Sequence, residues 1–370
     1  MANDSLDSML PNIVVARHPI MTEDLSTIIG ADLPWSQFDG ATVMVSGASG
    51  FIGSHLVETL LHRNEVDGTA KTRVIALSRN QSRAAVRFSA YSGRQDLHIL
   101  TQDVVSPIEY SGKLDFVIHA ASNASPIHYA SDPIGTHLAN SLGTYNLLRL
   151  ASERNCRSFL FVSSGDVYGV VQGETPLVSE DTFGALDPMQ IRSCYGEGKR
   201  SGENLCACWT HQHGLPTTVA RLSHTYGPGL APDDGRVFAD FVACAVAGQD
   251  IVLTSDGTAS RPFCYITDAI IGLFTIMLLG TPGEAYNLAN DDATISVAEL
   301  ARVVVGCVPE LGIRPVFDTG ARPLRYVPSQ NAGGIVDTRK LRALGWKPTI
   351  TPQIGFSRTI ESYRSTDSQL

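Results

Sequence analysis

Short apolar runs alternate with helical stretches over much of this sequence. The runs contain few polar residues and lie at Thr42–Ser46, Arg73–Leu77, Leu97–Leu100, Asp115–His119, Ser158–Ser163 and Thr217–Leu222. Runs of this kind are typical of parallel strands that helices cover on both faces. Strand–helix alternation over about 180 residues predicts an α/β fold with a Rossmann-type doubly wound parallel sheet. Right-handed crossovers would gather the carboxyl ends of the strands at one edge, where ligands bind.

The regular pattern fades after Tyr226, where Gly227–Gly229 and Pro232–Gly235 are loop signals. We therefore expect a second, smaller α+β lobe for the substrate. The predicted parts, with some segments interleaved, are a leader at 1–40, an NAD(P)-binding Rossmann domain at 41–225 and a C-terminal lobe at 226–370. Within the leader, Trp35 and Phe38 predict packing onto the body of the protein.

Composition excludes several classes of protein. Apolar residues make up 43% of the chain and charged residues 18%, which is ordinary for a globular protein. The net charge of −9 repels phosphate backbones, so we expect no nucleic-acid partner. We also expect no membrane partner, because no apolar run reaches the length of a membrane span and the start lacks a secretory signal. The seven scattered cysteines lack paired zinc spacing, which indicates reduced thiols, a cytoplasmic location and no metal site.

A glycine-rich segment follows the first predicted strand directly. Glycines at a strand–helix turn let the backbone approach a diphosphate, and the helix start offers free N–H groups. An amphipathic helix follows, which completes the context expected for dinucleotide binding. The predicted contacts in this turn are Gly47, Ser49, Gly50, Phe51, Ile52 and Gly53.

The end of the second strand bears on the choice between NAD and NADP. NAD sites usually carry an acid there for the ribose hydroxyls, but this chain has Ser78 and Arg79. The pair is able to accept the extra phosphate of NADP; the alternative is that Arg79 stacks on the adenine or faces solvent. Asp103, after the third strand, is a candidate partner for the adenine amine. We expect NAD and leave NADP open.

Tyr195 and Lys199 stand four residues apart, which places them on one face of a helix. A nearby ammonium is expected to lower the pKa of the phenol, so that Tyr195 acts as a base. Upstream, the run Phe161–Gly169 ends a buried strand with small hydroxyls. Ser164 is thus placed to hydrogen-bond the reacting oxygen while Tyr195 takes its proton.

Together these features resemble the extended short-chain dehydrogenase/reductase superfamily, of the NAD-dependent epimerase/dehydratase type. Further segments are similar to UDP-glucuronate decarboxylases (UDP-xylose synthases), and the resemblance covers about residues 41–365. These segments are His119–Pro126 with Tyr129 and Pro133, Arg192–Arg200, Asp234–Val237 with Phe241, Arg261–Tyr265 with Asp268, and Leu344–Pro348.

The resemblance implies roles for individual residues. The implied catalytic residues are Ser164, Asp166, Tyr195 and Lys199. Further implied cofactor contacts are Val104, Ala120, Ala121, Ser122, Asn140, Leu222 and His224, with Tyr195 and Lys199. The implied substrate contacts are Ser125, Pro126, Tyr129, Ser164, Arg192, Arg236, Val237, Arg261 and Tyr265. Arg261 would contact the nucleotide phosphates, and Arg192 is a candidate partner for a carboxylate.

Three positions depart from the family's pattern. Asp166 stands where the family has Glu, Gly165 replaces a hydroxyl, and His224 replaces an Asn. The implied activity is oxidation of a sugar C4 hydroxyl followed by decarboxylation of UDP-glucuronate or a related nucleotide hexuronate. C4 epimerisation, 4,6-dehydration and NADPH-dependent reduction of a 4-keto sugar remain alternatives. A sensor without turnover is a further alternative, although such proteins tend to lose the Tyr or the Lys.

A homodimer is also expected. The helices near Pro133–Ala151 and Tyr195–His211 carry an additional apolar face that includes Leu205, Ala207 and Trp209. Related enzymes pair such helices across a dimer interface. The alternative is that this face belongs to the internal core.

Overall fold

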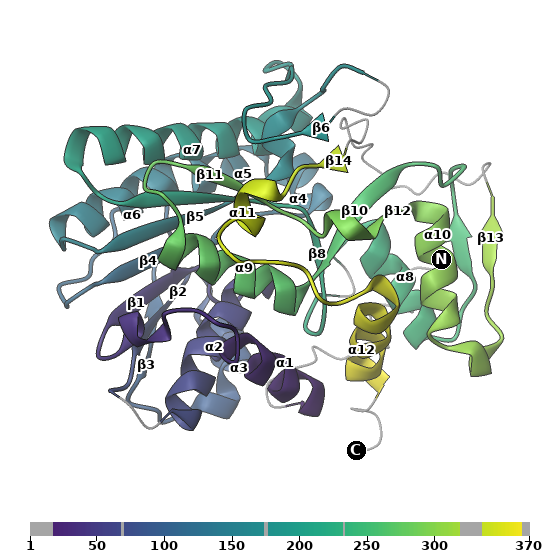
Figure 1. The fold of residues 1–370 in the computed structure, drawn as a ribbon, viewed down its shortest axis with the longest axis horizontal. Helices are drawn as coiled ribbons and strands as arrows, with labels where there is room; N and C mark the ends of the chain where they lie inside the picture. The colour runs from purple at the N-terminus through teal and green to yellow at the C-terminus, as the bar shows by residue number, and fades with distance from the viewer. Residues whose placement is uncertain (1–17, 68–69, 174–176, 232–233, 319–334, 365–370) are drawn as a thin grey trace.

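The computed structural model describes residues 18–67, 70–173, 177–231, 234–318 and 335–364. At its centre lies a parallel sheet of seven strands in the order β11-β7-β5-β4-β1-β2-β3 (Figure 1). This order is that of a doubly wound sheet, so the predicted α/β class is confirmed. The strands are β1 (Thr42–Ser46), β2 (Arg73–Ser78), β3 (Leu97–Thr101), β4 (Phe116–His119), β5 (Ser158–Ser164), β7 (Thr217–Leu222) and β11 (Ala285–Leu288).

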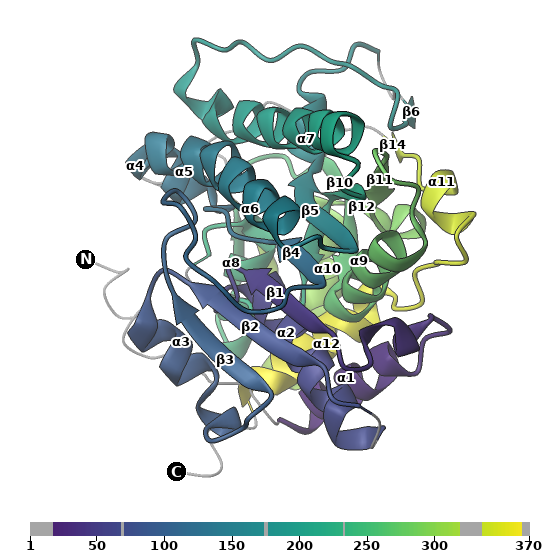
Figure 2. The same cartoon turned by 90° about the vertical axis from the view of Figure 1, so that its left-hand side faces the viewer.

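Helices cover both faces of this sheet, which explains why its inner strands are largely apolar and buried. One face is covered by α2 (Phe51–Val66) and α9 (Ile266–Leu279), and the other by α6 (Leu142–Glu153) and α7 (Cys194–His213). Figure 2 shows α7 beside α5 (Pro133–Asn140) and α6, on the side away from α1 and α2. Two shorter helices lie in the connections, α3 (Gln81–Arg87) and α4 (Pro126–Ser131).

Six of the seven strands lie within one residue of the predicted runs. The strand that the pattern missed is β11, which pairs with β7 although it lies beyond residue 226. It has four residues, and Asn287 interrupts its apolar side chains. Its place in the sheet shows that the two lobes share segments.

Outside the large sheet, β14 pairs with β6, a strand that precedes residue 226. The smaller lobe contains a three-stranded sheet in the order β12-β10-β8 and the pairing of β13 with β9. Its core is continuous with one face of the large sheet, because a single cluster of buried side chains runs from Val43 and Leu160 to Phe263 and Leu300. The remaining elements outside the large sheet are β6 (Leu177–Val178), β8 (His224–Tyr226), α8 (Val237–Val246), β9 (Ile251–Leu253), β10 (Ser260–Tyr265), β12 (Thr294–Ser296), α10 (Val297–Gly306), β13 (Pro315–Phe317), β14 (Ile335–Val336), α11 (Arg339–Arg342) and α12 (Pro352–Arg364).

The described part of the leader packs onto the body, as the sequence predicted. It contains α1 (Pro19–Ile29) and a short 3-10 helix (Trp35–Phe38). The Trp35 ring lies 5.0 Å from that of Phe274, and the Phe38 ring lies 4.9 Å from that of Phe116. Residues 1–17 lie outside the described residues.

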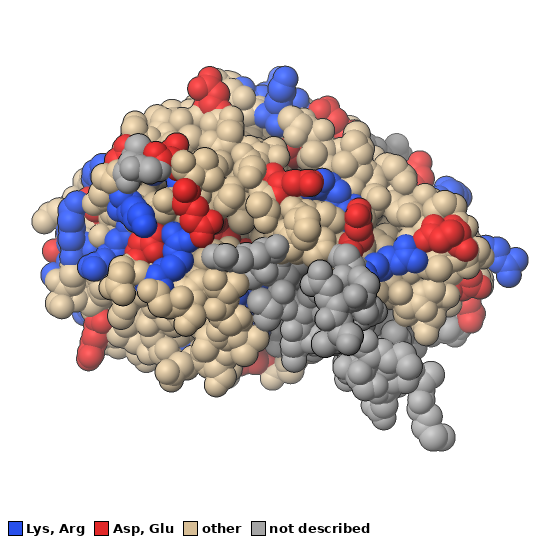
Figure 3. Space-filling model, turned by 90° about the horizontal axis from the view of Figure 1, so that it is seen from below, with Lys and Arg blue, Asp and Glu red and all other residues tan. Residues whose placement is uncertain are grey.

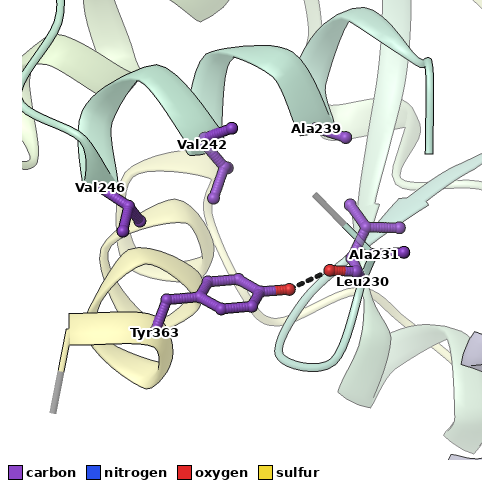
Figure 4. Close-up of a pocket in the computed structure, with 7 residues that line it drawn as sticks. Leu230, Ala231, Ala239, Val242, Val246 and Tyr363 are labelled. Atoms are coloured by element: carbon purple, nitrogen blue, oxygen red, sulfur yellow. Dashed lines mark hydrogen bonds between the residues drawn. The ribbon is translucent and has the colours of Figure 1, made fainter. Parts of the chain in front are cut away.

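Acidic and basic side chains are interspersed on the face seen in Figure 3, and neutral residues cover most of what that view describes. Among the described residues, no helix is long and apolar enough to cross a membrane. A small apolar pocket lies between α8 and α12, where the Tyr363 hydroxyl donates to the carbonyl of Leu230 (Figure 4). Its walls include none of the predicted site residues, so the candidate chemistry lies elsewhere.

Candidate active site

The turn from β1 into α2 forms a cradle that excludes side chains. Gly47 has a φ of +66°, and a Cβ there would lie 2.6 Å from the Cα of Ala121. A Cβ on Gly53 would lie 2.2 Å from the Gly47 carbonyl oxygen. Glycine is therefore required at both positions, for backbone conformation at the first and for close approach at both.

The start of α2 suits an anionic ligand. Gly50 is the N-cap and provides no side-chain hydrogen bond, and the first turn contains no acidic residue. Its backbone N–H groups and dipole then favour a diphosphate. Two further predicted cofactor contacts, Ser122 and Asn140, are able to form additional hydrogen bonds. The Ser122 hydroxyl and the side-chain amide oxygen of Asn140 are buried and have no hydrogen-bond partner among the described residues. These features fit a dinucleotide such as NAD.

The predicted adenosine contacts lie at the ends of β2 and β3. The Ser78 hydroxyl is 2.9 Å from that of Ser49 in the cradle. Arg79 donates to the side chain of Asn123 at 3.1 Å. The Asp103 carboxylate accepts the backbone N–H of Val105 at 3.1 Å, so Asp103 is engaged in its own loop. The structure brings Ser49, Ser78 and the cradle together.

The proton-handling residues meet at the carboxyl end of β5. Ser164 is the last residue of this strand, and Tyr195, in the first turn of α7, lies close enough that the Ser164 hydroxyl favours the ionised phenol. Lys199, one turn later, donates to the Val162 carbonyl at 2.6 Å, and its Nζ lies 5.7 Å from the Tyr195 ring centre. Tyr195 is 6% exposed and Lys199 is 2% exposed. The predicted group of Ser164, Tyr195 and Lys199 is therefore assembled in the structure.

Burial sets the charge states of this group. Desolvation raises the pKa of Tyr195 to about 12, and Asp166 adds to the rise, while Ser164, Arg236 and Arg192 oppose it. Desolvation also lowers the pKa of Lys199 to about 7. The pKa of the phenol is therefore raised where the sequence predicted a lowered one, because burial outweighs the opposing charges of Arg236 and Arg192. A phenolate at Tyr195 therefore needs further positive charge beside it.

An aromatic and cationic stack covers Tyr195. The ring of Tyr129 lies 4.8 Å from that of Tyr195, at an interplanar angle of 20°. The Arg192 guanidinium lies 4.4 Å from the ring centre of Tyr129, a residue of α4. It also forms an ion pair with Asp166, with 3.2 Å between the Arg192 nitrogen and the Asp166 carboxylate oxygen. Arg192 and Asp166 are 19% and 27% exposed, so this pair is accessible to a ligand.

The loop before α8 joins the same region. The Ser125 hydroxyl donates to the carbonyl of Asp234 at 2.5 Å, and Asp234 forms an ion pair with Arg236. The His224 ring contacts that of Phe263, with the ring centres 5.8 Å apart. Burial, together with the charges of Arg261 and Arg236, lowers the pKa of His224 to about 3. His224 is therefore neutral and lies among predicted substrate-binding arginines.

The remaining predicted contacts flank this group. Pro126 begins α4, Val237 begins α8, and Leu222 lies opposite Ser164 in the register of β5 and β7. Ala120 and Ala121 follow β4, and the Ala121 N–H donates to the Ser46 hydroxyl.

Two predicted residues face elsewhere. The side chain of Val104 is buried in the core between the sheet and α6, against Gly143. Tyr265 is fully buried, and its hydroxyl donates to Asp24 of the leader at 2.7 Å. The structure thus places the Tyr265 side chain in the packing of α1 and not with the other predicted substrate contacts. An aromatic residue immediately before an apolar helix gives no signal of which way its side chain points.

Sequence reasoning missed an ion pair beside this group. Glu203 lies on α7, one turn after Lys199, and pairs with Arg221 of β7 at 2.8 Å. The i, i+4 spacing from Lys199 was a signal for Glu203. No local pattern pointed to its partner.

Comparison with known proteins places the chain among enzymes of nucleotide sugars. Residues 43–289 match the model of the NAD dependent epimerase/dehydratase family. The chain is 33% identical over 326 residues to UDP-glucuronic acid decarboxylase 5 of Arabidopsis thaliana, which covers 87% of this chain and 89% of that protein. It is 31% identical over 332 residues to UDP-glucuronic acid decarboxylase 1 of Xenopus tropicalis, with 89% and 73% covered.

Solved structures share the fold. A UDP-glucose 4-epimerase of Thermotoga maritima superposes with a TM-score of 0.73 at 23% identity, covering 88% of this chain and 99% of that chain. A UDP-glucuronic acid 4-epimerase of Bacillus cereus, in complex with UDP-glucuronic acid and NAD, superposes with a TM-score of 0.72 at 22% identity, covering 88% and 99%.

Proposed function

Since the chain belongs to the NAD dependent epimerase/dehydratase family, we propose that it converts a UDP-hexuronate, UDP-glucuronate first, to the UDP-pentose and CO₂. One observation carries this choice of substrate. The accessible Arg192–Asp166 pair lies beside the stacked rings of Tyr129 and Tyr195, so a guanidinium stands ready for a carboxylate next to the proton-transfer group.

The residues of the site supply the binding and the proton transfer. The cradle of Gly47 and Gly53 would hold the diphosphate of NAD, and Lys199 would hold its nicotinamide ribose. When bound, NAD supplies a hydride acceptor for C4 and returns the same hydride at the end, so none is consumed. Tyr195 takes the proton of the C4 hydroxyl as C4 becomes a ketone, while Ser164 donates a hydrogen bond to that oxygen.

The C4 ketone makes the hexuronate a β-keto acid. The bond from C5 to the carboxylate then breaks, CO₂ leaves, and the electron pair remains as an enolate. Ser164 and Tyr195 stabilise the enolate oxygen by hydrogen bonds. A proton from solvent water then adds at C5, and return of the hydride to C4 gives the pentose, with Tyr195 returning its own proton to the C4 oxygen.

This mechanism requires an ionised Tyr195, and nearby positive charges stabilise that phenolate. Arg192 and Arg236 both favour the ionised form of Tyr195, and the ammonium of Lys199 lies one turn away. In this proposal Asp166 releases Arg192 to the substrate carboxylate. The carboxylate of Asp166 is then placed beside the sugar or a water.

An assay with matched variants tests the proposal. The protein is incubated with UDP-glucuronate, and UDP-xylose and CO₂ are measured. We expect turnover by the wild type, a loss of at least about 100-fold for Tyr195→Phe, and a raised KM for Arg192→Gln. Arg339→Gln, which changes a side chain 79% exposed on α11, is the control. Absence of pentose product from UDP-glucuronate would overturn the proposed reaction.

A second candidate is NADPH-dependent reduction of a 4-keto sugar nucleotide. The observation in its favour is that β2 ends in Ser78 and Arg79 without a carboxylate. Consumption of NADPH with a keto-sugar nucleotide, without release of CO₂ from UDP-glucuronate, would favour this reaction.

We further propose a homodimer through α5, α6 and α7. Apolar side chains are exposed on the first two helices, with Ile134 at 73%, Leu142 at 40% and Tyr145 at 42%, and Trp209 of α7 packs on Tyr145. Light scattering after size-exclusion chromatography should give twice the chain mass, and Ile134→Glu should give the monomer.

We also propose a cytoplasmic location, because all seven cysteines are free thiols. Cell fractionation tests this location.

A further inference from the structure

A buried ion pair lies directly behind the proton-handling group. Arg221 of β7 donates to both carboxylate oxygens of Glu203, with N–O distances from 2.8 to 3.2 Å. The side chains are 11% and 13% exposed, so water screens the pair little. Separating the two side chains would leave an unpaired charge in the protein interior, which is costly. The pair therefore holds α7 and β7 in a fixed relative position.

Glu203 contacts the catalytic strand and shares a helix face with the catalytic lysine. Its carboxylate accepts a hydrogen bond of 2.5 Å from the hydroxyl of Ser163, the neighbour of Ser164 in β5. It lies one helical turn after Lys199 on α7. One carboxylate therefore links the strand that holds Ser164 to the helix that holds Tyr195 and Lys199.

Arg221 extends the same network to the segment that carries Asp166. Its guanidinium donates to the Tyr168 hydroxyl at 3.1 Å and to the Glu180 carbonyl at 2.8 Å. The Tyr168 hydroxyl in turn donates to Asn287 of β11 at 2.5 Å. Tyr168 ends the short 3-10 helix Gly165–Tyr168, so Arg221 holds this helix against the sheet.

The charge of Glu203 also reaches Lys199. Burial disfavours the ammonium, and Glu203 is the group that raises the pKa of Lys199 against it. The other titratable groups that face Lys199 are Tyr195 on α7 and His119 on β4. His119 is fully buried and has a pKa of about 3, so it stays neutral at the pH of the reaction.

We propose that Glu203 and Arg221 are positioning residues for the C4 oxidation step: their ion pair holds the end of β5 and the 3-10 helix against α7, so that Ser164, Tyr195 and Lys199 face one another with Lys199 charged. This inference rests on the proposed function. It predicts effects on kcat and on the titration of Lys199, whereas a pair that only stabilises the fold would affect neither in folded protein.

The kinetic test compares Glu203→Gln, Glu203→Asp and Glu197→Gln as full-length protein with NAD. Glu203→Gln should lower kcat about 10- to 100-fold with KM changed less than two-fold, and the alkaline limb of the kcat profile should move down by about one pH unit. Glu203→Asp should recover part of kcat and most of the pH profile. Glu197→Gln removes a carboxylate from the same helix, where it pairs with Arg200, and should match the wild type.

A second measurement does not depend on the substrate. The lysine ¹³Cε resonance of Lys199, assigned by its loss in Lys199→Arg, should titrate about one pH unit lower in Glu203→Gln than in the wild type. An unchanged Lys199 titration in folded Glu203→Gln overturns the inference, even if UDP-glucuronate is not the substrate. A fall of kcat that follows only the unfolded fraction, or that Glu197→Gln reproduces, overturns it as well. Failure of the wild type to release CO₂ while the Lys199 titration shifts would instead count against the proposed reaction.

Discussion

Replacement of Gly53 by Ala should disable the diphosphate cradle. The added Cβ would lie 2.2 Å from the carbonyl oxygen of Gly47 and 2.8 Å from its carbonyl carbon. Because such contacts normally begin near about 3.4 Å, the start of α2 and the turn must separate by about 1 Å. Both obstructing atoms belong to the backbone, so no flexible side chain is available to yield.

The size of the effect follows from this displacement. Overpacking of this kind costs about 1–3 kcal/mol, and about 1.4 kcal/mol corresponds to tenfold in affinity. We therefore expect Gly53→Ala to bind NADH roughly 10- to 100-fold more weakly than the wild type. Titration calorimetry with NADH on protein freed of bound nucleotide measures this ratio, and urea unfolding verifies that the variant is folded.

Gly306→Ala is the matched control. It adds the same methyl group to a helix, α10, where the nearest atoms belong to the Gln353 side chain at 3.9 Å. Because Ala is the better helix former, we expect unchanged affinity and equal or higher stability. If folded Gly53→Ala binds NADH within two-fold of the wild type, the steric account of the cradle is refuted.

Three further predictions concern the leader, the buried histidines and the proposed base. Asp24→Asn should lower the free energy of unfolding in urea by about 3 kcal/mol, because it breaks a buried ion pair with Arg358. Glu23 pairs with the same arginine but its side chain is 65% exposed, so Glu23→Gln should lower the free energy of unfolding by less than about 0.5 kcal/mol. Equal losses in the two variants would contradict this reasoning. Burial lowers the pKa of His55 to about 3, so the unfolded chain binds more protons below its ordinary pKa near 6.5 and stability falls as the pH drops. This group accounts for about 1.4 kcal/mol per pH unit between pH 6 and 4, and urea midpoints of His55→Gln should decline less steeply than those of the wild type; identical slopes would disprove the assignment. Tyr195→Phe should bind NADH as tightly as the wild type while losing catalysis, and calorimetry showing weakened binding would argue for a binding role.

Local pattern was sufficient for six of the seven strands of the large sheet and for the cradle. Each of six strands was signalled by an apolar run, and helices bury inner strands such as β1 and β5 on both faces. The cradle depends on Gly47, which directly follows β1, and on Gly53 in the first turn of α2. Tyr195 and Lys199 share a helix face, and Ser164 ends the neighbouring strand. The spacing of these residues in the sequence was therefore enough to predict that they lie together.

Long-range partners were beyond local pattern. Strand β11 joins the sheet through its register with β7, about 65 residues earlier in the chain, and its four residues carry no distinctive period. Tyr265 meets Asp24 across 241 residues, which no spacing rule reports. The pKa of Tyr195 depends on how deeply its phenol is buried, and burial at that depth is a property of the assembled site.

The return of β11 to the large sheet constrains how such enzymes can be recombined. The chain leaves this sheet after β7 and re-enters it at Ala285, with β8, β9 and β10 in between. A chimera that took residues 226–370 from a relative would therefore exchange an edge strand of the dinucleotide sheet along with the lobe. A chimera should therefore exchange only the segment between two junctions, one after Leu222 and one before Ala285, so that β11 keeps its pairing with β7.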